Sequence, residues 1–189
     1  MPPTGGSFSG IGCTSYCGLI WLNRFTPNVT DYPITINSVS TIFGSPAGWN
    51  AAGDTISVFV YQDSDSDPSN GATPVGIPTV YTMGAPANSF VTIPLSPPVV
   101  VSGPGEVLIA LSNPNATNVG LRPASADSGP FVGRSWLGNN TSTTPPDLAS
   151  PSVGLMLNTA AITGFVGNWL IRATGTNGPG EPIVLDSSR

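Results

Sequence analysis

The stretch Thr55-Ile56-Ser57-Val58-Phe59-Val60-Tyr61 decides the fold class of this chain. It alternates strictly, with an aliphatic side chain at every second position, as a strand does when one of its faces lies on a hydrophobic core. We therefore predict that Ile56, Val58 and Val60 point into the core. The segment Glu106–Leu111 is apolar on both faces after its glutamate, which is typical of a central strand covered on both sides.

Short apolar runs of this kind recur, while Pro or Gly interrupts almost every window long enough for a helix. A phase slip near Ser38 in the segment 34–43 predicts a β-bulge, and Pro78 demotes the segment 75–81 to a sheet edge. The longest connection, 138–151, is predicted to be a solvated loop. The remaining predicted strands are 19–25, 90–95, 99–101, 119–122, 133–137, 153–157 and 168–174.

This pattern predicts an all-β fold, a two-sheet antiparallel sandwich of jelly-roll type with extended N- and C-terminal segments. An immunoglobulin-like sandwich is the second choice, because the two cysteines lie too close together to bridge two sheets. The length suits one domain. We expect an N-terminal extension over residues 1–16, the sandwich over 17–175, and a C-terminal segment over 176–189.

The C-terminal segment combines a Gly/Pro-rich spacer with a short β-prone stretch that contains Ile183, Val184 and Leu185. The sequence places this stretch outside the domain proper. One interpretation is an ordinary terminal tail. The other is a donor strand that leaves its own domain and pairs with the open edge of a neighbouring copy.

The composition excludes most kinds of catalytic site. The 189 residues contain no His and no Lys, so sites that need an imidazole or a lysine amine cannot be built. Nothing in the sequence pairs two of the ten carboxylates across a cleft, as glycoside hydrolysis requires. We therefore predict that the protein is not an enzyme.

The low charge also bears on the partners of this chain. Charged residues make up 8% of the chain and the net charge is −5, which argues against nucleic acid as a partner. No apolar stretch is long enough for a membrane helix, so we expect no membrane insertion. A surface of hydroxyls, amides and glycine suits packing against copies of itself.

The sharpest local signal is Asp63-Ser64-Asp65-Ser66-Asp67-Pro68-Ser69-Asn70-Gly71, which directly follows a predicted strand. Three carboxylates at alternate positions of a turn-forming loop should converge on one point, as a calcium ion requires. We predict a calcium site formed by Asp63, Asp65, Asp67 and Asn70. The alternative is an acidic hairpin tip that keeps a sheet edge soluble.

Two further candidate sites involve Cys13, Cys17 and Trp49. The cysteines cannot complete a zinc site without other Cys or His ligands, so we predict a small disulfide loop, with two buried free thiols as the alternative. Trp49 lies in a predicted loop. It serves either as a cap on the sandwich or as a stacking platform for a sugar ring.

Five segments of the chain carry a family resemblance. They are Trp21-Leu22-Asn23-Arg24-Phe25-Thr26-Pro27, Val58-Phe59-Val60-Tyr61-Gln62-Asp63-Ser64-Asp65, Ser102-Gly103-Pro104-Gly105-Glu106-Val107-Leu108-Ile109-Ala110, Gly133-Arg134-Ser135-Trp136-Leu137-Gly138 and Gly167-Asn168-Trp169-Leu170-Ile171-Arg172-Ala173. These segments resemble β-sandwich modules of large secreted or cell-surface bacterial proteins, most of them uncharacterised. The resemblance covers residues 17–175 and implies an extracellular, non-catalytic setting. It transfers no active-site residue, because a fold alone does not carry an activity.

These features together predict a structural protein of the cell surface or extracellular space that assembles with copies of itself. In this interpretation it is a subunit of a fibre or filament in which a terminal segment completes a neighbour's sheet. The first alternative is a carbohydrate-binding module that holds polysaccharide through Trp49. The second alternative is an accessory domain of a larger secreted enzyme.

Overall fold

The computed structural model describes residues 11–12, 18–43, 50–85, 88–113, 123–127, 129–140, 146–150, 155–162, 165 and 167–186. Within these residues the elements are ten strands and two short 3-10 helices. They are β1 (Gly18–Phe25), η1 (Val29–Asp31), β2 (Ile34–Ile42), β3 (Thr55–Asp63), β4 (Thr73–Thr82), β5 (Phe90–Val101), β6 (Glu106–Ser112), β7 (Ser135–Asn140), β8 (Leu155–Asn158), η3 (Thr159–Ala161), β9 (Ile171–Thr176) and β10 (Pro182–Asp186).

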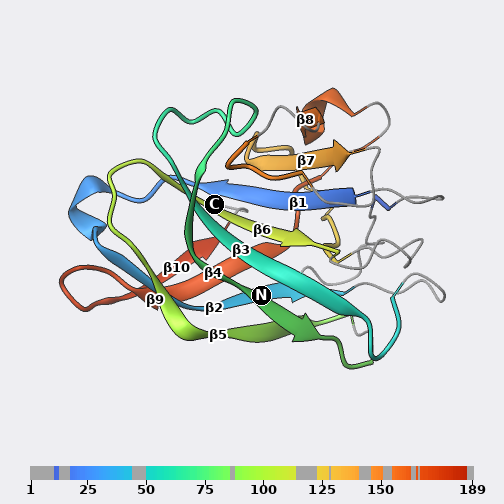
Figure 1. Cartoon of the computed structure of the whole chain (residues 1–189), viewed down its shortest axis with the longest axis horizontal. Coiled ribbons are helices and arrows are strands. Elements are labelled where there is room, and N and C mark those ends of the chain that lie inside the picture. The colour runs from blue at the N-terminus through green and yellow to red at the C-terminus, as the bar shows by residue number, and fades with distance from the viewer. Residues whose placement is uncertain are drawn as a thin grey trace.

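The strands form two sheets that pack face to face (Figure 1). The larger sheet has the order β4-β3-β6-β1-β7-β8, and the smaller has the order β10-β9-β2-β5. Neighbouring strands are antiparallel throughout. The predicted all-β, two-sheet antiparallel sandwich is therefore confirmed. The described part of the chain holds no helix long and apolar enough to cross a membrane.

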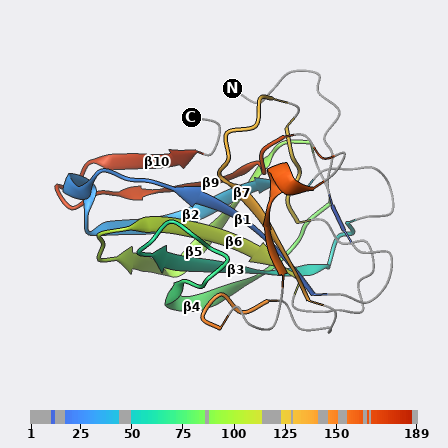
Figure 2. The ribbon, with the colours of Figure 1, turned by 90° about the horizontal axis from the view of Figure 1, so that it is seen from above.

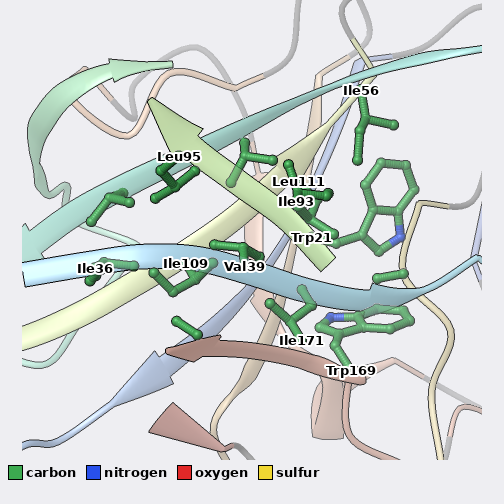
Figure 3. Packing of buried hydrophobic residues seen from close by; sticks show 14 of the residues in the cluster. Trp21, Ile36, Val39, Ile56, Ile93, Leu95, Ile109, Leu111, Trp169 and Ile171 are labelled. Atoms are coloured by element: carbon green, nitrogen blue, oxygen red, sulfur yellow. The ribbon is translucent and has the colours of Figure 1, made fainter. Parts of the chain in front are cut away.

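The main core lies between the two sheets, where inward-facing side chains of both sheets interdigitate (Figure 3). Ile56, Val58 and Val60 belong to it, as the alternation predicted. Two indole rings, those of Trp21 and Trp169, are at most 1% exposed and lie among aliphatic side chains. A core of this kind supplies most of the free energy that holds two sheets together.

The outer face of the larger sheet is also covered, which the sequence predicted for β6 but not for its neighbours. Ile20, Leu22 and Leu108 form a second cluster with Leu148, whose side chain is fully buried. The carbonyl of Leu148 accepts a hydrogen bond of 2.7 Å from the amide of Ala72. The prediction of a solvated loop over 138–151 is therefore wrong at this point, because one leucine brings the connection back onto the sheet.

A buried polar network joins the two sheets. The Asn23 amide of β1 donates to the carbonyls of Trp169 and Ile171 at 2.7 and 3.1 Å, and Asn23 accepts a bond of 2.8 Å from the Ser135 hydroxyl. The same hydroxyl oxygen accepts the amide of Trp169 at 2.9 Å. Each of these buried groups has a partner, so the network fixes β1, β7 and the start of β9 relative to one another.

Strand bounds differ from the sequence prediction mainly near irregular positions. The register of β2 shifts between Ile36 and Ser38, which confirms the bulge. The segments 90–95 and 99–101 are one strand, β5, which continues through Pro97 and Pro98. The predicted strands 133–137, 153–157 and 168–174 are observed as β7, β8 and β9 with shifted ends, and 119–122 lies outside the described residues.

Three of the four sheet edges can be compared for their protection against unwanted pairing. The β4 edge contains Pro74 and Pro78, and the β5 edge contains Pro94, Pro97 and Pro98. Proline has no N–H to donate to an added strand, so these two edges are guarded. The β10 edge has one proline, Pro182, at its first residue. It is the least guarded of the three.

Candidate functional site: the free edge of β10

The C-terminal segment belongs to the sandwich, contrary to the sequence prediction. Ile183, Val184 and Leu185 form β10, which pairs antiparallel with β9 of the same chain and ends the smaller sheet. The expectation of a spacer with a strand outside the domain is therefore wrong in this structure. The physical reason is a tight turn over residues 177–181 that returns the chain onto β9.

The turn between β9 and β10 is held by several backbone contacts. The amide of Asn177 donates to the carbonyl of Glu181 at 2.9 Å, and the amide of Glu181 donates to Asn177 Oδ1 at 2.7 Å. Gly178 donates to the carbonyl of Asp31 at 2.8 Å. A Cβ atom at Gly178 would lie 2.6 Å from the carbonyl oxygen of Tyr32, so this close approach requires glycine.

The side chains of β10 divide between the core and the solvent. Ile183 and Leu185 are partly buried against the main core, whereas Val184 points outward and is 65% exposed. Asp186 forms an ion pair of 2.9 Å with Nε of Arg172 on β9. The Arg172 guanidinium lies 4.1 Å from the ring centroid of Phe90, which adds a cation–π contact.

The backbone of Val184 faces away from β9. In an antiparallel pair, residues that exchange hydrogen bonds alternate with residues that do not. The bond from Asn177 to the Glu181 carbonyl, together with the register, places Ile183 and Leu185 at hydrogen-bonded positions. Val184 consequently directs its N–H and C=O groups toward the free side, where an added strand could pair with them.

A groove of about 340 Å³ runs along this free side. No residue of β9 lines it, so the groove lies beyond the outer edge of the sheet. Polar groups contribute more of its exposed wall than apolar carbon does, and Arg134 forms no ion pair with any residue in the described ranges. The lining residues are Phe25, Thr26, Pro27, Asn28, Asp31, Arg134, Ile183, Val184, Leu185 and Asp186.

The aspartate loop, residues 63–71, leads from the last residue of β3 toward β4 and begins opposite the first residue of β6. Its carboxylates accept hydrogen bonds from its own backbone. Oδ1 of Asp63 accepts the amide of Asp65 at 3.1 Å, Oδ1 of Asp65 accepts the amide of Asp67 at 3.1 Å, and Oδ1 of Asp67 accepts the amide of Ser69 at 3.0 Å. The side-chain Nδ2 of Asn70 donates to Oδ2 of Asp65 at 2.7 Å. In turns of this kind each aspartate carboxylate accepts the backbone N–H of the residue two positions further along, so each carboxylate has its own partner.

The predicted convergence of these carboxylates is not found. Among the residues that the structure describes, no three Asp, Glu, His or Cys side chains are grouped so that they could hold a metal ion. The cation that contacts this loop is instead the guanidinium of Arg24, which donates from Nη1 to the carbonyl of Ser66. Its Nε lies 3.1 Å from Oε2 of Glu106.

Asp63 differs from the other two aspartates because it is only 1% exposed. It lies directly opposite Glu106 on β6, and its Oδ2 has no hydrogen-bond partner within the described residues. Burial raises the pKa of the Asp63 carboxyl, and the nearby Asp65 and Glu106 raise it further. Hydrogen bonds, first that from Asn70, lower the pKa of Asp65.

The remaining predicted site residues, Cys13, Cys17 and Trp49, lie outside the described residues. Sequence reasoning singled out Ile183, Val184 and Leu185 on one wall of the groove, but it missed Arg24, Arg134 and the other wall, residues 25–28 and 31. A single weak signal pointed to Arg24, namely a charged residue inside the apolar run of β1. Nothing in the sequence pointed to the groove, because its two walls lie about 150 residues apart in the chain.

Comparison with known proteins adds no relative to this description. No protein-family model, no curated protein and no solved structure matches the chain.

Proposed function

We propose that this chain is a non-catalytic structural protein of the extracellular space or cell surface that associates with copies of itself through the edge of β10. The observation that carries the proposal is the outward-facing backbone of Val184 beside an open groove. An edge strand with unpaired N–H and C=O groups is a template for association, and soluble proteins ordinarily protect such edges.

The contrast with the other edges supports the same proposal. Prolines guard β4 and β5, whereas β10 contains no proline after Pro182 and no lysine. Its one charged residue, Asp186, is neutralised by Arg172. With charged residues at 8% of the whole chain, little long-range repulsion opposes contact between copies.

The test compares the wild-type protein with Val184→Pro in sedimentation velocity and electron microscopy. Because the N–H of Val184 faces away from β9, proline removes an outward donor and leaves the pairing with β9 in place. Val184→Thr is the matched control, since it keeps the N–H and the branched shape. Deleting residues 181–189 is a poorer test, because Ile183 and Leu185 cover the core.

We expect wild type and Val184→Thr to form large species and Val184→Pro to remain at the monomer mass of 19.2 kDa. All three should unfold at similar temperatures. A wild-type protein that stays monomeric up to the highest soluble concentration would refute the proposed function. If the Val184→Pro variant assembles like wild type, the edge of β10 is not the surface through which copies associate.

A further inference from the structure

The chain contains two Asn–Gly dipeptides, Asn70–Gly71 in the aspartate loop and Asn177–Gly178 in the turn between β9 and β10. An asparagine that precedes glycine is prone to spontaneous deamidation, because glycine has no side chain to keep its backbone nitrogen away from the asparagine side chain. The structure gives the two dipeptides opposite surroundings. They should therefore differ in reactivity as long as the protein is folded.

The reaction needs water as its only co-reactant. The backbone nitrogen of the glycine loses its proton and bonds to Cγ of the asparagine, while the side-chain nitrogen takes up a proton and leaves as ammonia. The product is a cyclic succinimide. Water then adds to one of the two ring carbonyls and breaks its C–N bond, which leaves aspartate or isoaspartate. No oxidant or reductant takes part.

The Asn177–Gly178 dipeptide is restrained at both of its reacting groups. The turn lies against η1, where the nucleophile of the reaction, the amide of Gly178, donates to the carbonyl of Asp31 at 2.8 Å (Figure 2). Oδ1 of Asn177 accepts the amide of Glu181 at 2.7 Å, which fixes the side-chain carbonyl. Both hydrogen bonds must open before the nitrogen can reach Cγ.

The Asn70–Gly71 dipeptide has no such restraint. Asn70 is exposed, and the amide of Gly71 donates no hydrogen bond to any residue that the structure describes. Nδ2 of Asn70 donates to Asp65 at 2.7 Å, but this bond holds the leaving nitrogen and not the nucleophile. All three residues line an open, mainly polar groove of about 250 Å³, which admits the water that opens the succinimide.

We propose that Asn70 is a site of spontaneous deamidation, with the backbone nitrogen of Gly71 as the nucleophile, and that the folded structure protects Asn177. The modification changes the net charge from −5 to −6, since one neutral amide becomes a carboxylate. An oxygen then replaces the Nδ2 donor that faces Oδ2 of Asp65, so an attraction becomes a repulsion between like charges. Because no enzyme is required, the modified fraction increases with the age of the protein.

The experiment follows both asparagines in the same sample. The protein is incubated at mildly alkaline pH and digested with pepsin in acid, where further succinimide formation is slow. Mass spectrometry measures the mass gain that accompanies replacement of –NH2 by –OH at each site. A second incubation in denaturant removes the surroundings of both dipeptides and serves as the reference.

Two variants at position 70 complete the experiment. Asn70→Asp marks where the modified protein elutes in anion-exchange chromatography. Asn70→Gln is the matched control, because glutamine keeps the amide and closes a ring much more slowly. Circular dichroism and the unfolding midpoint verify that each variant is folded.

We expect Asn70 to be modified at least about tenfold faster than Asn177 in the folded protein, because Asn177–Gly178 must first lose two hydrogen bonds. In denaturant the two rates should converge. Aged wild type should contain a more acidic species that elutes with Asn70→Asp, whereas aged Asn70→Gln should contain almost none.

Three outcomes would overturn this inference. The first is equal rates at the two asparagines in the folded protein. The second is an Asn70 that stays intact in the folded protein while it is modified in denaturant. The third is an acidic species that forms equally from Asn70→Gln, which would place the modification at another residue. None of these outcomes involves contacts between copies, so each leaves the proposed function as it stands.

Discussion

Replacing Arg24 with methionine should destabilise the fold strongly, because Arg24 compensates a buried carboxylate. Glu106 is 6% exposed, and its Oε2 lies 3.1 Å from Nε of Arg24. Methionine keeps most of the apolar length of the side chain and removes the charge. Glu106 would then retain the 2.8 Å bond from the Thr26 hydroxyl and lie beside the equally buried Asp63.

The expected cost follows from the burial of the pair. Removing one partner of a buried ion pair costs about 3–5 kcal/mol, whereas an exposed pair is worth less than about 1 kcal/mol. The side chain of Arg24 is 24% exposed and that of Glu106 is 7% exposed, so we take the lower end, about 3 kcal/mol. For a domain of this size that lowers the melting temperature by about 6–12 °C.

The assay is denaturant unfolding of Arg24→Met, Glu106→Gln and the double variant, followed by fluorescence of the buried tryptophans. We expect the double variant to lose clearly less than the sum of the two single losses, since neither charge is then left unpaired. Arg134→Met, at a partly exposed arginine without an ion pair among the described residues, is the control and should change stability little. Losses below about 1 kcal/mol for both single variants would refute the reasoning.

Three further outcomes are expected. Asp63→Asn should gain stability relative to wild type as pH rises from 4 to 8, measured by unfolding titrations at each pH. Burial raises the pKa of Asp63 in the folded state, so the wild-type protein loses stability as this carboxyl is forced to ionise, whereas asparagine does not titrate. A stability difference that stays constant with pH would contradict this. Calcium binding by Asp63, Asp65 and Asp67 stays a prediction. If it is correct, calcium should raise the midpoint of thermal unfolding and a chelator should lower it. Equal midpoints would leave the Arg24 guanidinium as the cation that contacts this loop. Leu148→Ala should cost about 2–4 kcal/mol in chemical denaturation, since Leu148 is fully buried, whereas a solvated loop would show almost no effect.

The elements that the sequence predicted well are those whose environment is uniform along the strand. The alternation of residues 55–61 and the apolar run of β6 each reflect one kind of neighbour on each face, so local periodicity was sufficient. The bulge near Ser38 and the edge position of β4 also left local marks, a phase slip and a proline. These marks act within one strand and need no knowledge of its partners.

The elements that the sequence did not predict depend on distant partners. Asn23 is a polar residue inside a buried strand, and its hydrogen bonds reach residues more than 100 positions away. Arg24 is paired with Glu106 and a loop carbonyl on a different hairpin. Leu148 is one apolar residue in a polar connection, so composition alone indicated solvent. In each case the deciding contact has no local signature.

The position of the C-terminal segment depends both on its local sequence and on contacts with distant residues, and this position decides how copies can assemble. Its two glycines allow either an extended spacer or a tight turn, and the contacts with Asp31 and Tyr32 select the turn. A copy that donated β10 to a neighbour would first lose the burial of Ile183 and Leu185 and the ion pair of Asp186, and would regain the same contacts. Exchange therefore adds no new buried surface to offset the entropy of association. Docking beside an intact β10 adds new contacts to those already present, so it should be fast and reversible on dilution, whereas strand exchange should be as slow as the opening of the β9–β10 turn.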